Sequence, residues 1–174
     1  MTDIKIDSSL KASVNDGYKQ TLRQAQGRQM KEGYKMTKVG LIPEDWEVVE
    51  LKDLGEFYKG KGISKKEVSE IGCAALRYAE IYTHYDVFVK RARSYISEES
   101  AEKSFLVENG DLVFAGSGET PEDIGKSVVI LTNQDTYLGG DTVVLRQKKN
   151  NSLTLAYIFN SDLVRRQLFS MAQG

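Results

Sequence analysis

In the middle of this chain, glycines separate short apolar segments from one another. This spacing of glycines limits the possible folds more than any other feature of the sequence. Ten of the fifteen glycines lie between residues 55 and 140. The segments between them are rich in β-branched and aromatic side chains, which is typical of strands bounded by turns. We therefore expect a strand at the end of residues 51–58, others at 74–82, 87–89, 93–97, 108–115, 125–132 and 142–146, and a turn at Gly139 and Gly140.

Helical patterns accompany these strands. Residues 97–103 predict a helical turn capped by Ser97, with Glu98 and Glu99 near the positive end of its dipole. The tail predicts a helix with Ser152 as its cap, because apolar side chains recur at helical spacing at Leu153, Ala156, Tyr157, Leu163, Val164, Leu168 and Met171. The sequence therefore predicts an α+β domain with a compact mixed or antiparallel β-sheet, flanking helices and a C-terminal helix.

The beginning of the chain differs from the rest. Residues 1–35 are polar and rich in glutamine, so we expect an arm or linker there, with a short helix at 16–26, and a domain at 36–174. The domain opens on a turn fixed by Pro43. An amphipathic stretch follows, and its apolar side chains are expected to anchor it against a core: Trp46, Val48, Val49 and Leu51.

Cysteine and histidine are too scarce for most metal or nucleophile chemistry. Cys73 lies among small residues and is expected in the packed interior, while a histidine-based metal site or a catalytic triad would have to rest on His84 alone. No segment approaches the roughly 18 apolar residues of a membrane span, and the first residues lack the apolar core of a signal peptide. We expect a cytoplasmic protein with no membrane partner.

Charge is distributed unevenly along the chain, although the net charge is only −1. Residues 59–93 carry eight basic and four acidic side chains, whereas residues 94–125 carry one basic and eight acidic. Such segregation can produce a basic face on a protein that is neutral overall, although charge runs are also typical of ordinary solvated surface.

The basic block also contains aromatic side chains and a glycine-rich loop. Cations interleaved with aromatics suit a nucleic-acid surface, because the cations contact phosphates or guanine edges and the rings pack on sugars and bases. On composition alone this reading and an ordinary exposed sheet face are equally supported. The predicted DNA-binding residues are Lys59, Lys61, Ser64, Lys65, Arg77, Tyr82, His84, Arg91 and Arg93, with Ser117 from a second glycine loop as a weaker candidate.

Two catalytic interpretations have less support. Gly60-Lys-Gly62, Gly116-Ser-Gly118 and Gly125-Lys-Ser127 are only fragments of phosphate-binding loops. A metal-dependent nuclease could be drawn from Asp111, Glu119 and Lys126, but their spacing does not require it. We therefore predict no catalytic residue and no metal ligand.

An ordered series of motifs resembles a known family. Residues 39–51 read Val-Gly-Leu-Ile-Pro-Glu-Asp-Trp-Glu-Val-Val-Glu-Leu, which is similar to the opening signature of type I restriction–modification specificity subunits. Residues 61–65 resemble the family's basic loop, 76–83 its central strand and 110–126 its long loop; 138–145 and 164–167 complete the series. The resemblance covers about residues 36–174, and the order of the motifs makes it specific.

The resemblance implies a non-catalytic role in a larger complex. Each target-recognition domain of such a subunit reads one half of a bipartite site on double-stranded DNA. The subunit lies between modification (methyltransferase) subunits, which bind S-adenosylmethionine and methylate adenine, and motor–nuclease restriction subunits join that core. No cofactor is expected in this chain.

A full specificity subunit has two recognition domains separated by long helices, so the resemblance predicts a first target-recognition domain truncated before its spacer helix. Two alternatives remain open at this stage. One is a protein-interaction adaptor that docks on the modification subunit without touching DNA. The other is a small nuclease or methyltransferase fragment.

Overall fold

The computed structural model describes residues 32–172, with side chains up to Leu168, and the chain divides into two compact units between Val48 and Val49. The described part of the first unit is a hairpin of β1 (Tyr34–Thr37) and β2 (Gly40–Pro43). The Thr37 hydroxyl stabilises its turn by donating to the Gly40 carbonyl over 2.8 Å. The helix predicted at 16–26 lies outside the described residues. Strand β1 crosses the expected boundary at residue 35, and residues 1–31 of the predicted arm or linker lie outside the described residues.

The predicted anchoring of residues 46–51 is wrong for three of its four apolar side chains, while Val48 is half-buried. Trp46, Val49 and Leu51 are 39%, 52% and 38% exposed. Residues 46–50 form neither helix nor strand, so their apolar side chains have no common face to bury. A short 3-10 helix, η1 (Leu51–Asp53), follows and leads into the first strand of the second unit.

The second unit contains two mixed β-sheets, which confirms the predicted α+β class. The five-stranded sheet has the order β3 (Glu56–Lys59), β11 (Thr142–Arg146), β8 (Leu112–Ala115), β9 (Ser127–Ile130) and β5 (Phe88–Val89). The four-stranded sheet has the order β6 (Ser94–Ile96), β4 (Cys73–Leu76), β10 (Thr136–Leu138) and β7 (Phe105–Val107). Neighbouring strands are antiparallel except for the parallel pairs β4–β10 and β5–β9.

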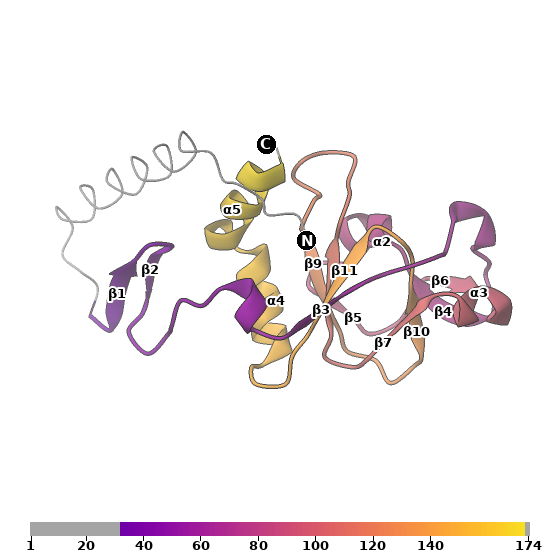
Figure 1. Cartoon of the computed structure of the whole chain (residues 1–174), viewed down its shortest axis with the longest axis horizontal. Helices are drawn as coiled ribbons and strands as arrows, with labels where there is room; N and C mark the ends of the chain where they lie inside the picture. The colour runs from indigo at the N-terminus through magenta and orange to yellow at the C-terminus, as the bar shows by residue number, and fades with distance from the viewer. Residues whose placement is uncertain (1–31, 173–174) are drawn as a thin grey trace. The chain divides into compact units, whose positions relative to one another are not determined.

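The central strands β8 and β9 of the five-stranded sheet are buried on both faces. In Figure 1, α4 (Ser152–Asn160) and α5 (Asp162–Ala172) lie on one side of this sheet, and the four-stranded sheet with α2 (Tyr78–Thr83) lies on the other. Alternate residues of β8 divide between the two cores: Val113 packs toward the second sheet, and Leu112 packs toward the helices. A strand buried on both faces is continuously apolar, and this explains the runs in the sequence.

Several predicted elements are confirmed, and others need correction. Helix α3 (Glu98–Glu102) begins as predicted, with the Ser97 hydroxyl accepting from the Ser100 backbone N–H. Residues 74–82 are not one strand, because β4 ends at Leu76 and α2 begins at Tyr78. The Glu80 carboxylate accepts from the Arg77 backbone N–H over 3.0 Å, which favours a helix start at that point. Strands β7 and β10 were not predicted.

The tail is two helices and not one. The backbone is extended at Ser161, which separates α4 from α5. Asn151, and not Ser152, caps α4, because its side chain accepts from the Thr154 backbone N–H over 2.9 Å. Tyr157 was expected on the buried side but is 56% exposed. Cys73, expected in the interior, is a half-buried free thiol on β4.

Candidate nucleic-acid interface

Three segments that the sequence analysis singled out meet at the turn of residues 139–141, between β10 and β11. Backbone hydrogen bonds join Gly139 N to the Leu76 carbonyl (3.1 Å), Gly140 N to the Gly62 carbonyl (2.8 Å) and Gly116 N to the Asp141 carbonyl (2.7 Å). The basic loop (residues 59–66), the start of α2 and the glycine loop (residues 116–125) therefore form one group. We call this group the loop cluster.

The close approach within the loop cluster requires glycine at residue 60. A Cβ atom there would lie 2.2 Å from the Gly139 carbonyl oxygen and 2.1 Å from the Thr142 hydroxyl. Gly60 N also donates to the Thr142 carbonyl over 3.0 Å. The glycine that looked like part of a phosphate-binding pattern thus lets two backbone segments pack together.

The basic loop presents exposed ammonium groups on a fixed backbone. Its lysines are exposed, and none forms an ion pair within residues 32–168: Lys59, Lys61, Lys65 and Lys66. Ile63 is buried at the middle of the loop and anchors it. Ser64 precedes the 3-10 helix η2 (Lys65–Glu67), and its backbone N–H donates to the Glu67 carboxylate over 2.6 Å. This bond, with further bonds from the Ser64 and Ser100 hydroxyls, lowers the pKa of Glu67.

Arg77 lies at the junction of β4 and α2, beside the buried carboxylate of Glu80. The Arg77 Nη2 atom lies 3.7 Å from Glu80 Oε1, which also accepts from the Ser94 hydroxyl over 2.5 Å. Glu80 is only 3% exposed, so its carboxylate is a fixed support for the half-buried arginine. The Arg77 Nε–H is buried without a hydrogen-bond partner in the described structure.

Helix α2 lies against the glycine loop through Tyr82. Burial raises the pKa of Tyr82, and neighbouring Tyr78, Glu119 and Asp123 raise it further. The Tyr78 and Tyr82 rings are 6.3 Å apart between centroids. Tyr82 therefore faces the loop that carries the half-buried Ser117. His84 is exposed at the end of α2, with Nδ1 2.5 Å from the Thr83 hydroxyl oxygen.

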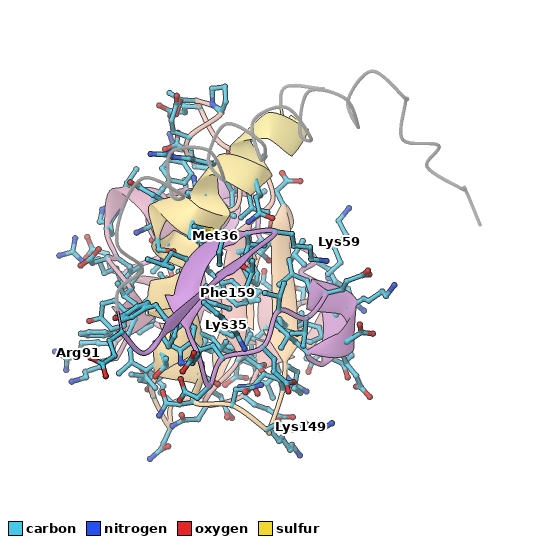
Figure 2. All side chains as sticks on the ribbon, turned by 90° about the vertical axis from the view of Figure 1, so that its left-hand side faces the viewer. Lys35, Met36, Lys59, Arg91, Lys149 and Phe159 are labelled. Atoms are coloured by element: carbon cyan, nitrogen blue, oxygen red, sulfur yellow. The ribbon has the colours of Figure 1, made fainter. Side chains whose placement is uncertain are left out.

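The basic block forms two separate patches and not one continuous face. Lys59 ends β3 and Arg91 follows β5, which are the opposite edges of the five-stranded sheet. Four strand spacings of about 4.8 Å separate these edges by roughly 19 Å. Figure 2 shows the labelled Lys59 and Arg91 side chains on opposite sides of the unit. Arg93 directly precedes Ser94, which pairs with Ala75 two residues before Arg77, so Arg93 lies on the α2 side.

The residues of the metal-nuclease alternative do not converge. Ala115 N donates to the Lys126 carbonyl, so Lys126 lies beyond the end of β8, whereas Asp111 precedes its start. Asp111 is also paired with Arg146, whose Nη2 lies 2.7 Å from Asp111 Oδ2. Within residues 32–168 no three histidine, cysteine or acidic side chains are grouped so as to hold a metal ion. No helix in the described part of the chain is long and apolar enough to span a membrane.

This architecture defines an α+β domain in which loops at the ends of two packed sheets carry the polar residues singled out by the sequence analysis. The chain belongs to the family of the type I restriction modification DNA specificity domain, whose model matches residues 43–174. It is 30% identical over 128 residues to the putative type I restriction enzyme MjaX specificity subunit of Methanocaldococcus jannaschii, covering 73% of this chain and 30% of that protein. It is 26% identical over 148 residues to the MjaVIII specificity subunit of the same organism, covering 81% and 34%.

Solved structures share the fold. A chain from work on complex assembly and conformational transition of the type I R-M system superposes with a TM-score of 0.52 at 14% identity. The HsdS subunit from Thermoanaerobacter tengcongensis superposes with a TM-score of 0.50, also at 14% identity. Each comparison covers 94% of this chain and 38% of the other. The chain thus spans about a third of the length of the relatives that it matches.

Proposed function

We propose that the second unit binds double-stranded DNA in a sequence-specific manner and reads one half of a bipartite target for a type I restriction–modification complex. The observation that carries this proposal is the loop cluster, where a lysine-rich loop, a supported arginine and a glycine loop meet at one turn. Family membership provides independent support, since the matching model describes a DNA specificity domain.

The residues divide into two roles in this proposal. Exposed lysines of the basic loop contact phosphates, because an ammonium group on a flexible stem offers charge without fixed geometry. Arg77 reads a guanine edge, because a planar guanidinium can donate two parallel hydrogen bonds to O6 and N7. Glu80 supports Arg77 and limits its movement. Tyr82, His84 and Ser117 flank this position from α2 and the glycine loop.

Arg91 and Arg93 provide a second group of contacts in the same proposal. A duplex is about as wide as the separation of the two sheet edges, so the patches are expected to contact different stretches of the DNA backbone. We expect Arg91 to contact phosphate. Arg93 lies closer to Arg77, where it can approach either the backbone or a base edge.

The proposed partners are the modification and restriction subunits of the complex. Chemistry on the target base belongs to the modification subunit, which is expected to bind S-adenosylmethionine and take the flipped adenine into its own pocket. No catalytic or cofactor-binding role is proposed for this chain. The cytoplasmic location expected from the sequence stays a prediction.

The test is selection from a randomised duplex library by the full chain, with and without its modification subunit, at two salt concentrations. Enrichment of a motif of a few base pairs, strengthened by the partner, is the expected result. No enrichment under either condition, with the modification subunit nevertheless bound, would overturn the proposal in favour of the adaptor. Binding that is independent of the DNA sequence and weakens steeply with salt would show that the chain makes only phosphate contacts.

A further inference from the structure

We infer that the junction of α4 and α5 holds the glycine loop in its DNA-reading conformation, with Arg165 as the positioning residue. This inference rests on the proposed function for its consequence on DNA reading. The structural role of Arg165 is argued from contacts between the two helices and the loop, and this role can be tested without DNA.

Arg165 reaches from α5 to two consecutive turns of the loop backbone. Its Nη1 donates to the Ile124 carbonyl over 2.9 Å, and its Nη2 donates to the Glu122 carbonyl. Arg165 forms no ion pair among the described residues, so its donors serve the loop backbone. Burial lowers the pKa of Arg165, and the charges of Asp123 and Glu122 offset this in part. A half-buried cation bound to carbonyl groups is a structural clamp and not a free DNA contact.

Two further contacts hold the exit of the loop. Gly125 has a φ of +76°, and a Cβ atom there would lie 2.9 Å from Leu168 Cδ1, so α5 packs directly on the loop backbone. Asn160, the last residue of α4, bonds both backbone groups of Ser127. Its Oδ1 accepts from Ser127 N over 3.1 Å, and its Nδ2 donates to the Ser127 carbonyl over 2.7 Å.

The other backbone anchors of the loop lie at its base, where Gly116 N donates to the Asp141 carbonyl over 2.7 Å. Gly125 N donates to the Ala115 carbonyl over 2.8 Å and closes the base of the loop. Within it, the Asp123 carboxylate accepts from the backbone N–H and the hydroxyl of Thr120. Residues 116–126 contain neither helix nor strand, and Figure 1 shows the connection between β8 and β9 projecting beyond the strand ends. The clamp from α5 therefore limits which conformations the segment near Ser117 can adopt.

The structure offers a matched control in the next residue. Arg166 has the same charge, lies on the same helix and is exposed, with only a 3.8 Å ion pair to Asp162. Arg165→Ala and Arg166→Ala thus remove the same charge, but only the first removes the clamp. Arg165→Lys keeps the charge and retains a single ammonium that can bond one carbonyl at a time.

The test compares amide hydrogen exchange of residues 116–125 in the unliganded full chain. We expect Arg165→Ala to speed exchange there by about tenfold or more, the equivalent of one net bond from a charged donor, while Arg166→Ala matches the wild type. Arg165→Lys should fall between them. Equal loop exchange in Arg165→Ala and Arg166→Ala would overturn the clamp, provided that both variants retain the wild-type unfolding midpoint. If Arg165→Ala unfolds, the comparison of Arg165→Lys with Arg166→Ala decides the question.

DNA reading provides the second readout. The ratio of affinities for the selected and a scrambled duplex should fall by about tenfold in Arg165→Ala, with the same salt slope as Arg166→Ala. A loosened loop with an unchanged ratio would show that the loop does not read bases, which overturns the inference. A wild-type chain without sequence preference would instead overturn the proposed function, and the exchange comparison would still decide whether the clamp exists.

Discussion

Arg146 joins a buried carboxylate to two aromatic rings, at the end of the sheets away from the loop cluster. Its Nε and Nη2 atoms donate to the two carboxylate oxygens of Asp111 over 3.0 and 2.7 Å, and Asp111 is 2% exposed. The guanidinium also lies 5.2 Å from the centroid of the Tyr58 ring. Arg146 thus supports the fold. Because it lies away from the loop cluster, its substitution should affect stability and not the DNA contacts.

Arg146→Ala should lower the free energy of unfolding by about 3 kcal/mol, because it leaves the buried Asp111 carboxylate without its charged partner. Urea unfolding measures this change. The exposed Arg166→Ala should change the same free energy by less than about 0.5 kcal/mol. Equal effects of the two substitutions would contradict the structural role of the Arg146–Asp111 pair.

Arg77 and Lys61 should respond differently to substitution. Arg77→Gln should cost about 1–3 kcal/mol on the preferred duplex and relax selection at one base pair. Lys61→Ala should weaken binding to all duplexes alike and reduce the salt slope by about 1. Affinities for a panel of single-base variants at several salt concentrations separate the two cases. Uniform losses in both variants would contradict the division of roles.

At the scale of elements, the turn of residues 139–141 depends on two glycines in different ways. Gly60→Ala places a Cβ atom 2.2 Å from the Gly139 carbonyl oxygen, whereas the nearest atom to a Cβ on Gly140 is 3.7 Å away. Gly60→Ala should therefore destabilise the protein by about 1–3 kcal/mol and weaken DNA binding through the displaced basic loop. Gly140→Ala should be tolerated, and thermal unfolding with DNA titration of both variants checks this contrast.

The cap of α4 gives a second prediction for elements. Asn151→Ala should cost about 1 kcal/mol of stability, because the Thr154 N–H loses its acceptor. The Ser152 hydroxyl accepts instead from the Gln147 side chain over 2.8 Å. Chemical denaturation of the two alanine variants should thus rank Asn151→Ala as the more damaging. The reverse order would contradict the stabilising role of the Asn151 cap.

The sequence correctly predicted those helices and strands whose local residue pattern agrees with the burial and pairing that the fold gives them. The Ser97 cap and the long apolar strands belong to this class. The strand predicted at residues 74–82 was extended too far, because apolar and aromatic residues continue past Leu76. The helix-start signal was present, since Glu80 follows Arg77 by three residues. Strands β7 and β10 are three residues each, too short for a periodic pattern, and they exist because of pairing partners far away in the sequence.

At the scale of the whole molecule, the sequence identified residues of the candidate site but not their arrangement. The basic loop, Arg77 and the glycine loop were chosen for composition, and they meet only because the turn of residues 139–141 bonds to all three. The charge block at 59–93 suggested one face, but the chain crosses from one edge of the sheet to the other within it. Strand order is not encoded in local composition, so this split could not be predicted.

The two basic patches should contribute separately to DNA binding. The double variant Lys61→Ala/Lys65→Ala and the double variant Arg91→Ala/Arg93→Ala should each reduce the salt slope, by roughly 0.9 for each phosphate that is no longer neutralised. Because the two pairs lie on different loops, the quadruple variant should show about the sum of the two reductions. An unchanged slope in the Arg91/Arg93 variant would confine DNA binding to the loop cluster.

The central claim is that this chain reads DNA sequence through the loop cluster, and one ratio of affinities tests it directly. The measurement is the affinity of the chain, assembled with its modification subunit, for the selected duplex and for a scrambled duplex of equal length and composition. We predict that the selected duplex binds at least about tenfold more tightly, and that Arg77→Gln removes most of this difference. Equal affinity for the two duplexes in the wild-type complex would contradict the claim.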